Sequence, residues 1–247
     1  SNENIGTLTT QTMITVLGYG VSERLSVMAT LPYVWTHASQ GPLHGMDGVQ
    51  DLTLAAKYQL LATPFTSSGT LRALVVGIVG LPASDYTADF LPLSIGLHSQ
   101  RVAGRFTLNF QSNQRWFLNG SAGYTWRGTV QLDRPAYYTN GQLYLTDEVV
   151  MPDVFDYKLS GGFLKGRLYI PVSLSQQFTL GGGDIRRQDM PFVSNRMNFV
   201  TVDGAVMYSL PAPRELGIRL GASRVVSGRN VGQATAVSGG LFYTFHF

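Results

Sequence analysis

The chain ends in Gly239-Gly240-Leu241-Phe242-Tyr243-Thr244-Phe245-His246-Phe247, and this stretch decides the fold. Counting back from the last residue, every second side chain is large and apolar, and those between are mostly small or polar. Such alternation is typical of a β-strand with one apolar face, because successive side chains point to opposite sides. A soluble β-sandwich rarely leaves such an apolar edge free, since it invites aggregation. The pattern therefore favours the wall of a membrane-spanning β-barrel.

The composition agrees with an all-β membrane protein. Only 13% of the 247 residues are charged, about half the ~25% of ordinary soluble domains. Mean hydropathy is nevertheless only +0.06, and we find no apolar run of about 18 residues that would form a membrane helix. The absence of cysteine excludes disulfides and thiol chemistry. A formal net charge of +3 gives little support to nucleic-acid binding.

Turn residues divide the chain into about eleven alternating segments. We expect strands at 7–19, 24–36, 49–61, 71–82, 94–110, 115–127, 155–164, 167–180, 195–210, 216–227 and 235–247. Short and long connections alternate, which predicts a transmembrane up-and-down antiparallel barrel with short periplasmic turns and long extracellular loops. The first and last strands then both descend, whereas bacterial barrels usually have an even strand number. We therefore expect residues 1–247 to form a single barrel domain of about twelve strands that lacks its first ascending strand.

The C-terminal aromatic pattern also predicts location and partners. Leu241, Tyr243, Phe245 and Phe247 resemble the signal by which bacterial outer-membrane barrels are recognised for assembly. We thus expect the bacterial outer membrane, with its lipids and lipopolysaccharide, and the barrel assembly machinery as partners. No secretory signal stands at the start, so we expect a mature or truncated form. Aromatic residues near strand ends would form the interfacial girdles: Tyr33, Trp35, Tyr58, Tyr124, Trp126, Tyr208 and Tyr243.

Several short motifs point to a family. They are YGVSERL at 19–25, LPY at 31–33, GVQDLTLAAKY at 48–58, GLP at 80–82 and GSAGY at 120–124. Together they resemble the outer-membrane barrels assigned to transport in the phenol meta-degradation pathway, although Gln50 stands where that family usually has glycine before its aspartate. The resemblance implies an outer-membrane barrel of a transporter family. With the inward residues described below, we expect a channel for passive passage of small, partly hydrophobic molecules, aromatic or anionic ones among them.

Arginine placement is the second informative pattern. Five arginines lie near the starts of the expected ascending strands: Arg24, Arg72, Arg115, Arg167 and Arg219. Strand alternation turns them inward, which predicts a basic collar at the periplasmic mouth of the lumen. Further charged residues expected to face inward are Asp51, Lys57, Arg101, Arg105, Asp156, Lys158 and Asp203. Two interpretations remain open: these groups pair and fill a narrow lumen, or the collar selects anions such as aromatic carboxylates.

Apolar residues are also expected on the inner face. They are Met13, Tyr19, Met28, Phe117, Tyr169, Phe199, Met207 and Phe242. Beside inward charges, such groups suit a path for partly hydrophobic molecules. The alternative is simple packing, because a barrel of intermediate strand number has little empty interior.

Two other classes of function are alternatives to a channel. An outer-membrane hydrolase would need a histidine within hydrogen-bond reach of a nucleophile or of an acid that activates water. His37 and His44 lie in one expected loop near Asp47, and His98 precedes Ser99, but no serine motif of a hydrolase accompanies them. We therefore expect no catalytic residue, no metal site and no cofactor. A structural scaffold for a partner complex is the other alternative. Its contact surface would be the long loop 128–154, which carries Tyr137, Tyr138 and Tyr144.

Overall fold

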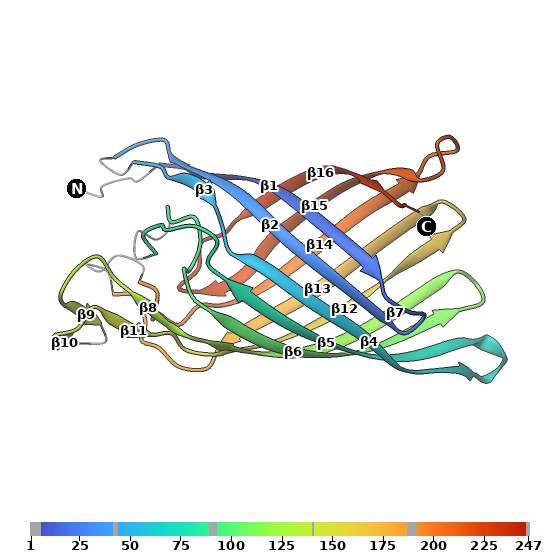
Figure 1. Ribbon diagram of the computed structural model, residues 1–247, viewed down its shortest axis with the longest axis horizontal. Helices are drawn as coiled ribbons and strands as arrows, with labels where there is room; N and C mark the ends of the chain where they lie inside the picture. Colours follow the sequence, from blue (N-terminus) through green and yellow to red (C-terminus); the bar gives the residue numbers. More distant parts are fainter. Residues whose placement is uncertain (1–5, 42–43, 89–92, 140, 187–191, 246–247) are drawn as a thin grey trace.

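The computed structural model describes residues 6–41, 44–88, 93–139, 141–186 and 192–245, and its ordered elements are almost all strands (Figure 1). The long strands are β1 (Leu8–Gly20), β2 (Leu25–Ala38), β4 (Leu52–Phe65), β5 (Gly69–Leu81), β6 (Arg101–Ser112), β7 (Trp116–Arg127), β12 (Val154–Lys165), β13 (Leu168–Thr179), β14 (Asn198–Ser209), β15 (Leu216–Arg229) and β16 (Thr235–Tyr243). The short ones are β3 (Asp47–Val49), β8 (Thr129–Gln131), β9 (Tyr137–Thr139), β10 (Gln142–Tyr144) and β11 (Glu148–Val150). One 3-10 turn covers Thr66–Ser68.

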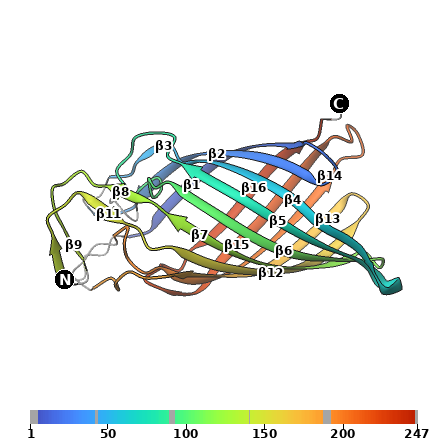
Figure 2. The ribbon, with the colours of Figure 1, turned by 60° about the horizontal axis from the view of Figure 1, so that its bottom comes forward.

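The long strands form one antiparallel sheet in the order β1-β2-β4-β5-β6-β7-β12-β13-β14-β15-β16, with β3 paired to β2. Each strand neighbours the next along the chain, which is the expected up-and-down topology. The sheet curls around a long axis, and its strands run obliquely to that axis (Figures 1 and 2). No helix in the described parts of the chain is long and apolar enough to cross a membrane.

Alternation along each strand gives the sheet two different faces. In β4 and β5 the pairs Leu54↔Val79 and Tyr58↔Val75 lie on one face. Their side chains are exposed or half-buried although they are apolar. Thr53 and Lys57 alternate with them on the other face. An exposed apolar face opposite a polar one is the reverse of a soluble protein and fits a wall surrounded by lipid.

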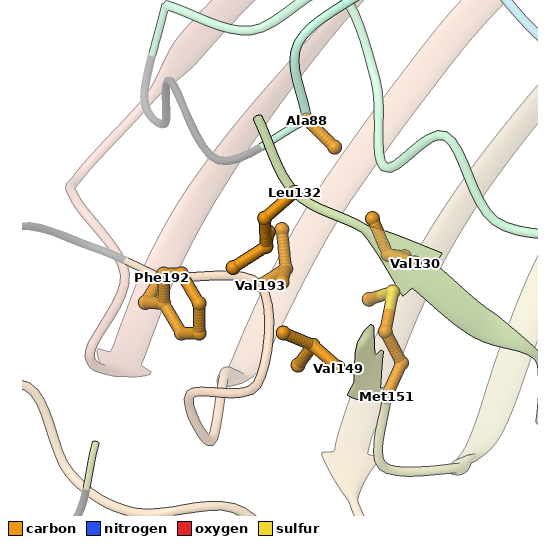
Figure 3. Close-up of a cluster of buried hydrophobic side chains, with 7 residues drawn as sticks. All are labelled: Ala88, Val130, Leu132, Val149, Met151, Phe192 and Val193. Atoms are coloured by element: carbon orange, nitrogen blue, oxygen red, sulfur yellow. The ribbon is translucent and has the colours of Figure 1, made fainter. Parts of the chain in front are cut away.

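Long connections gather at one end of the sheet, which we call the loop end, and short turns at the other, the turn end (left and right in Figure 1). At the loop end, three connections pack together through Ala88, Val130, Leu132, Val149, Met151, Phe192 and Val193 (Figure 3). These residues form the loop cap. A second buried group joins Tyr86 and Ile95 to Val34 of β2. The loop end therefore has a packed apolar core of its own.

The first and last strands of the sheet have no strand partner on their outer sides. In the described residues β1 pairs only with β2, and β16 only with β15. Every residue of β1 is exposed, as is every residue of β16 except Phe242. Because neighbours are antiparallel throughout and eleven long strands follow one another, β1 and β16 run in the same direction. We call the space between them the seam.

Three elements differ from those expected. The strand expected at 94–110 begins only at Arg101, because Leu93, Ile95 and Ser99 are buried in the mouth of the barrel instead of continuing the wall. The last strand ends at Tyr243 rather than at residue 247. Loop 128–154 contains two small hairpin-like pairs, β8 with β11 and β9 with β10.

Candidate functional site

The inner face of the sheet encloses a cavity of about 240 Å³. Its lining comes from six consecutive strands and from the connection 82–100: Asp51, Thr53, Ile78, Leu97, Ser99, Arg101, Ala103, Thr125, Arg127, Val154, Asp156 and Gln177. On the same face, ion pairs join side chains of strands that are two apart in the sheet, as the concave side of a curled sheet allows. This cavity therefore identifies the lumen and fixes which face of every strand points inward.

Inward basic residues outnumber inward acidic ones in the described residues. Assigned by lining and by strand alternation, the basic ones are Lys57, Arg72, Arg101, Arg105, Arg127, Lys158 and Arg219. The acidic ones are Asp51, Asp156 and Asp203. All seven lumen charges expected from the sequence thus lie on the inner face. Excess positive charge in a confined space of low dielectric attracts anions.

Part of this charge is neutralised by pairing across the lumen wall. Arg105 forms an ion pair with Asp156. Lys158 Nζ lies 3.3 Å from Asp203, whose carboxylate also accepts a 3.0 Å hydrogen bond from Ser173. Both aspartates are therefore engaged by basic neighbours. For these two pairs, the geometry supports the interpretation that inward charges pair with one another, rather than the one in which they select anions.

Other basic side chains contact neutral partners. The Arg72 guanidinium donates to Asn109 Oδ1 at 3.4 Å, a long hydrogen bond, and Arg219 donates to Ser238 Oγ at 3.0 Å. Arg101 donates to Thr53 Oγ1 at 2.9 Å. A hydroxyl or amide satisfies a donor without cancelling its charge. These arginines thus keep a net positive field along the inner face.

The expected collar is split between strands and turns. Only Arg72 and Arg219 lie within strands, on the inner face. Arg24, Arg115 and Arg167 lie in exposed turns before β2, β7 and β13, which corrects their expected place inside ascending strands. Arg115 has a left-handed φ of +74°. Each of the three carbonyls accepts a backbone hydrogen bond from the next strand of the sheet, where Gln59, Leu164 and Ser209 are the respective donors. The turn end therefore carries basic groups at its rim rather than a ring within the lumen.

Apolar residues share the inner face with the charges. Met28, Phe117, Tyr169, Phe199 and Phe242 all occupy inward positions by strand alternation. The Phe117 and Tyr169 rings stack with centroids 5.1 Å apart. The Phe242 ring covers Gly217, where a Cβ would lie 2.0 Å from a ring atom.

Met13 and Tyr19 face outward, contrary to expectation. In β1 they pair with the outward Tyr33 and Val27. The reason is that both faces of β1 carry apolar residues, so alternation alone does not decide which face is which. A shift of one residue then reverses every side chain of a strand.

The described parts of the connection 82–100, residues 82–88 and 93–100, lie at the loop end of the lumen. The Tyr86 hydroxyl donates to Asp51 at 2.5 Å and accepts from the His98 backbone N–H at 2.9 Å. Thr36 of β2 donates to the Leu93 carbonyl at 2.6 Å. Burial, and then the bond to Asp51, raise the pKa of Tyr86 far above its ordinary value, so its hydroxyl remains a donor. Beyond this connection a second cavity of about 420 Å³, lined by Tyr86, His98 and Leu132 among others, lies at the loop end.

No catalytic arrangement is present among the described residues. Ser99 is buried, and its hydroxyl lies 3.0 Å from the carbonyl oxygens of Gln100 and Gly128. The His98 ring packs edge-on against Tyr86 and lies 3.9 Å from Asp85. The two residues are thus adjacent in sequence but are not a nucleophile and base. In the parts that the structure describes, no three acidic, histidine or cysteine residues gather as metal ligands would.

Two of the four C-terminal residues expected as an assembly signal lie on the outward face. Leu241 and Tyr243 belong to β16 and are exposed, and the Tyr243 and Phe245 rings are 4.7 Å apart. Phe247 lies outside the described residues. Further aromatic pairs lie towards both ends of the outer face, including Tyr33 with Trp35 and Phe110 with Trp116. Aromatic residues in these positions match the interfacial girdles of outer-membrane barrels.

Comparison with known proteins agrees with this architecture. The family described as "Putative MetA-pathway of phenol degradation" matches residues 2–239. The chain belongs to this family. An outer membrane channel from Pseudomonas putida F1 has a similar crystal structure, with a TM-score of 0.69 and 18% identity over 96% of this chain and 83% of that one. The NanC porin gives a TM-score of 0.49 and 6% identity over 95% of this chain and 99% of that chain. The comparison with curated proteins found no match to this chain.

Two residues of the lumen site were not singled out from the sequence. Arg127 lines the cavity, and its inward direction follows from alternation with the outward Trp126. Tyr86 lies in a loop without periodicity, so no sequence signal places it beside Asp51. The match to the family confirms the resemblance seen in the short motifs, and the fold is that of an outer-membrane barrel.

Proposed function

We propose that this protein is an outer-membrane channel through which small, partly hydrophobic molecules, including aromatic and anionic ones, pass without energy input. The observation that carries the proposal is the inner face, where arginines without an acidic partner share the wall with apolar residues such as Met28 and Phe199. Within it, Arg101, Arg127, Ile78 and Leu97 line a cavity of about 240 Å³. A general porin lumen is more uniformly polar. The family description supports a role with aromatic compounds.

The orientation follows from the loops. Long loops of outer-membrane barrels are extracellular and short turns periplasmic. The loop cap then lies outside the cell, and the basic rim of Arg24, Arg115 and Arg167 lies at the periplasmic mouth. A molecule entering from outside would meet the connection 82–100 first, then the charged middle of the lumen.

Planar bilayer recordings test the channel and its charge preference together. We expect conductance with anion preference, measured as the reversal potential in a KCl gradient. The preference should weaken at 1 M salt, where the screening length is about 3 Å. Arg72→Gln and Arg115→Gln should each reduce it, and together reduce it further, whereas Arg224→Gln, which removes one positive charge from the outward face of β15, should not. Absence of conductance, or cation preference in the parent protein, would refute the proposal.

We also propose that an ascending strand preceding β1 completes the barrel at the seam. Because β1 and β16 run in the same direction, one strand antiparallel to both can pair with each edge. Such a strand would satisfy two rows of backbone groups that lipid cannot hydrogen-bond. The barrel would then have the even strand number usual for bacterial outer-membrane proteins.

A further inference from the structure

Two arginines meet at one side of the lumen cavity. Arg101 is the first residue of β6 and Arg127 the last of β7, and the register of the two strands places them directly opposite each other. Both are half-buried and both line the cavity. Like charges directly opposite on neighbouring strands are destabilising. The pairing of Arg101 with Arg127 is therefore expected to lower the stability of the sheet at this position, and nothing in the strand pairing offsets this loss.

Arg101 is fixed in its position by its surroundings. Its guanidinium donates to Thr53 Oγ1 at 2.9 Å. Its side chain crosses Gly80, where a Cβ would come within 2.2 Å of Nε. The absence of a side chain at Gly80 thus leaves room for the arginine to lie flat on the inner wall, with its remaining donors beside the cavity.

Arg127 has unused donors. Its backbone N–H donates to Asp153 at 3.0 Å. The carboxylate of Asp153 also attracts the charge of Arg127, but within the residues that the structure describes the guanidinium forms neither a hydrogen bond nor an ion pair. A half-buried guanidinium without a partner gains free energy from any acceptor that reaches it.

The acidic residues of the same cavity are already engaged. Asp51 accepts the hydroxyl of Tyr86, and Asp156 is paired with Arg105. Neither carboxylate forms an ion pair with Arg101 or Arg127. The positive charge of the arginine pair therefore faces the cavity.

Apart from the two arginines and two aspartates, the lining combines four apolar residues with Thr53, Ser99, Thr125 and Gln177. Ile78, Leu97, Ala103 and Val154 contribute to the same cavity. Its volume of about 240 Å³ would hold roughly eight waters at ~30 Å³ each, or one small organic molecule. Planar guanidinium forks match the geometry of a carboxylate, and the aliphatic side chains match an apolar body.

We propose that Arg101 and Arg127 form a binding subsite in the lumen for a small monocarboxylate with an apolar body. The carboxylate accepts hydrogen bonds from both guanidinium groups and relieves their repulsion, while its apolar part lies against Ile78 and Leu97. The subsite rests on the proposed channel function and specifies the class of molecule that the channel selects.

Calorimetric titration of the folded protein in detergent with benzoate tests the subsite. We expect benzoate to bind at least tenfold more tightly than benzyl alcohol, which has the same ring without the charge. Arg127→Gln and Arg101→Gln should each weaken benzoate binding tenfold or more. Arg127→Lys, which keeps the charge but loses the fork, should bind with intermediate strength. Arg224→Gln, on the outward face, is the matched control and should bind like the parent.

The results separate the subsite from the channel. Equal affinity for benzoate and benzyl alcohol, or variants at Arg101 and Arg127 that bind like the parent, would overturn the subsite even where bilayers still conduct. Benzoate binding without conductance would overturn the channel and leave the subsite standing. Heat-dependent migration on gels confirms that each variant is folded before it is titrated.

Discussion

Tyr86 ties the connection 82–100 to the barrel through one hydroxyl group, which donates to Asp51 and accepts from the His98 backbone. Replacing it by phenylalanine removes both bonds and leaves the buried Asp51 without its donor. Losing such a partner costs about 1–3 kcal/mol. We expect Tyr86→Phe to make this connection more sensitive to limited proteolysis, with Tyr138→Phe at an exposed tyrosine as control. Equal cleavage rates in both variants would show that the connection is held elsewhere.

Asp184 ties another loop to the end of β15. Arg229 donates to it at 2.8 and 2.5 Å and Asn230 at 2.8 Å, and these bonds lower the pKa of its carboxyl to about 2. A depressed pKa in the folded state means that the stabilisation is complete above the ordinary value near 3.8 and is lost as the pH falls towards about 2.

The tether should therefore survive mild acid. We expect hydrogen exchange of backbone amides around 181–186 to be the same at pH 7 and pH 5, once corrected for intrinsic rates, and to rise only near pH 2–3. Asp184→Asn should show faster exchange at every pH. Faster exchange in the parent already at pH 5 would contradict the assignment of this carboxyl as the tether.

At the scale of elements, β12 and β13 approach closely at a glycine. A Cβ at Gly162 would lie 2.0 Å from the carbonyl oxygen of Ile170, which is backbone and cannot move aside cheaply. Gly162→Ala should therefore lower the yield of folded barrel, measured as the heat-modifiable gel fraction. Gly120→Ala, in neighbouring β7 with nothing within 4 Å of its Cβ position, should fold like the parent. Equal yields would mean that this hairpin shifts without cost.

The elements also show what alternation can and cannot predict. Lys57 and Asp156 lie inward as expected, because their strands have one clearly apolar face. Residues 94–100 alternate similarly but are not wall, since Ile95 is buried against loop residues and Val34 rather than facing lipid. Alternating apolar residues indicate that every second side chain is shielded from water. They do not indicate whether lipid or another part of the protein shields it. Arg115 was misplaced because a tight turn interrupts the strand just before β7.

At the scale of the whole molecule, the seam makes the edges of β1 and β16 the weakest part of the wall. We expect backbone amides of residues 8–20 and 235–243 in this 247-residue chain to exchange faster than those of β6 and β7, which have partners on both sides. Protein bearing the proposed first strand should protect both edges. If the amides of β1, β16 and β7 in the 247-residue chain were equally protected from exchange, β1 and β16 would have to pair directly with each other.

The overall architecture can be predicted from the sequence, whereas the contacts inside the lumen can be predicted only in part. The strand periodicity and short turns predicted the order and antiparallel pairing of the long strands. The Arg105–Asp156 pair and the opposition of Arg101 to Arg127 depend on register between strands. A sequence does not state register, because each hairpin and bulge, such as the one at Leu60, shifts it by a residue.

The loop cap divides the connections at the loop end into buried residues, whose size is constrained by packing, and exposed residues, whose size is not. Val130 and Val149 are almost completely enclosed, so a change of size at either disturbs two other loops. Tyr138, Leu143 and Leu145, by contrast, project from the β9–β10 hairpin with more than half of their surface free. Replacement or lengthening of this hairpin should therefore leave the fold of the barrel unchanged, whereas the residues beneath it can change in size only together.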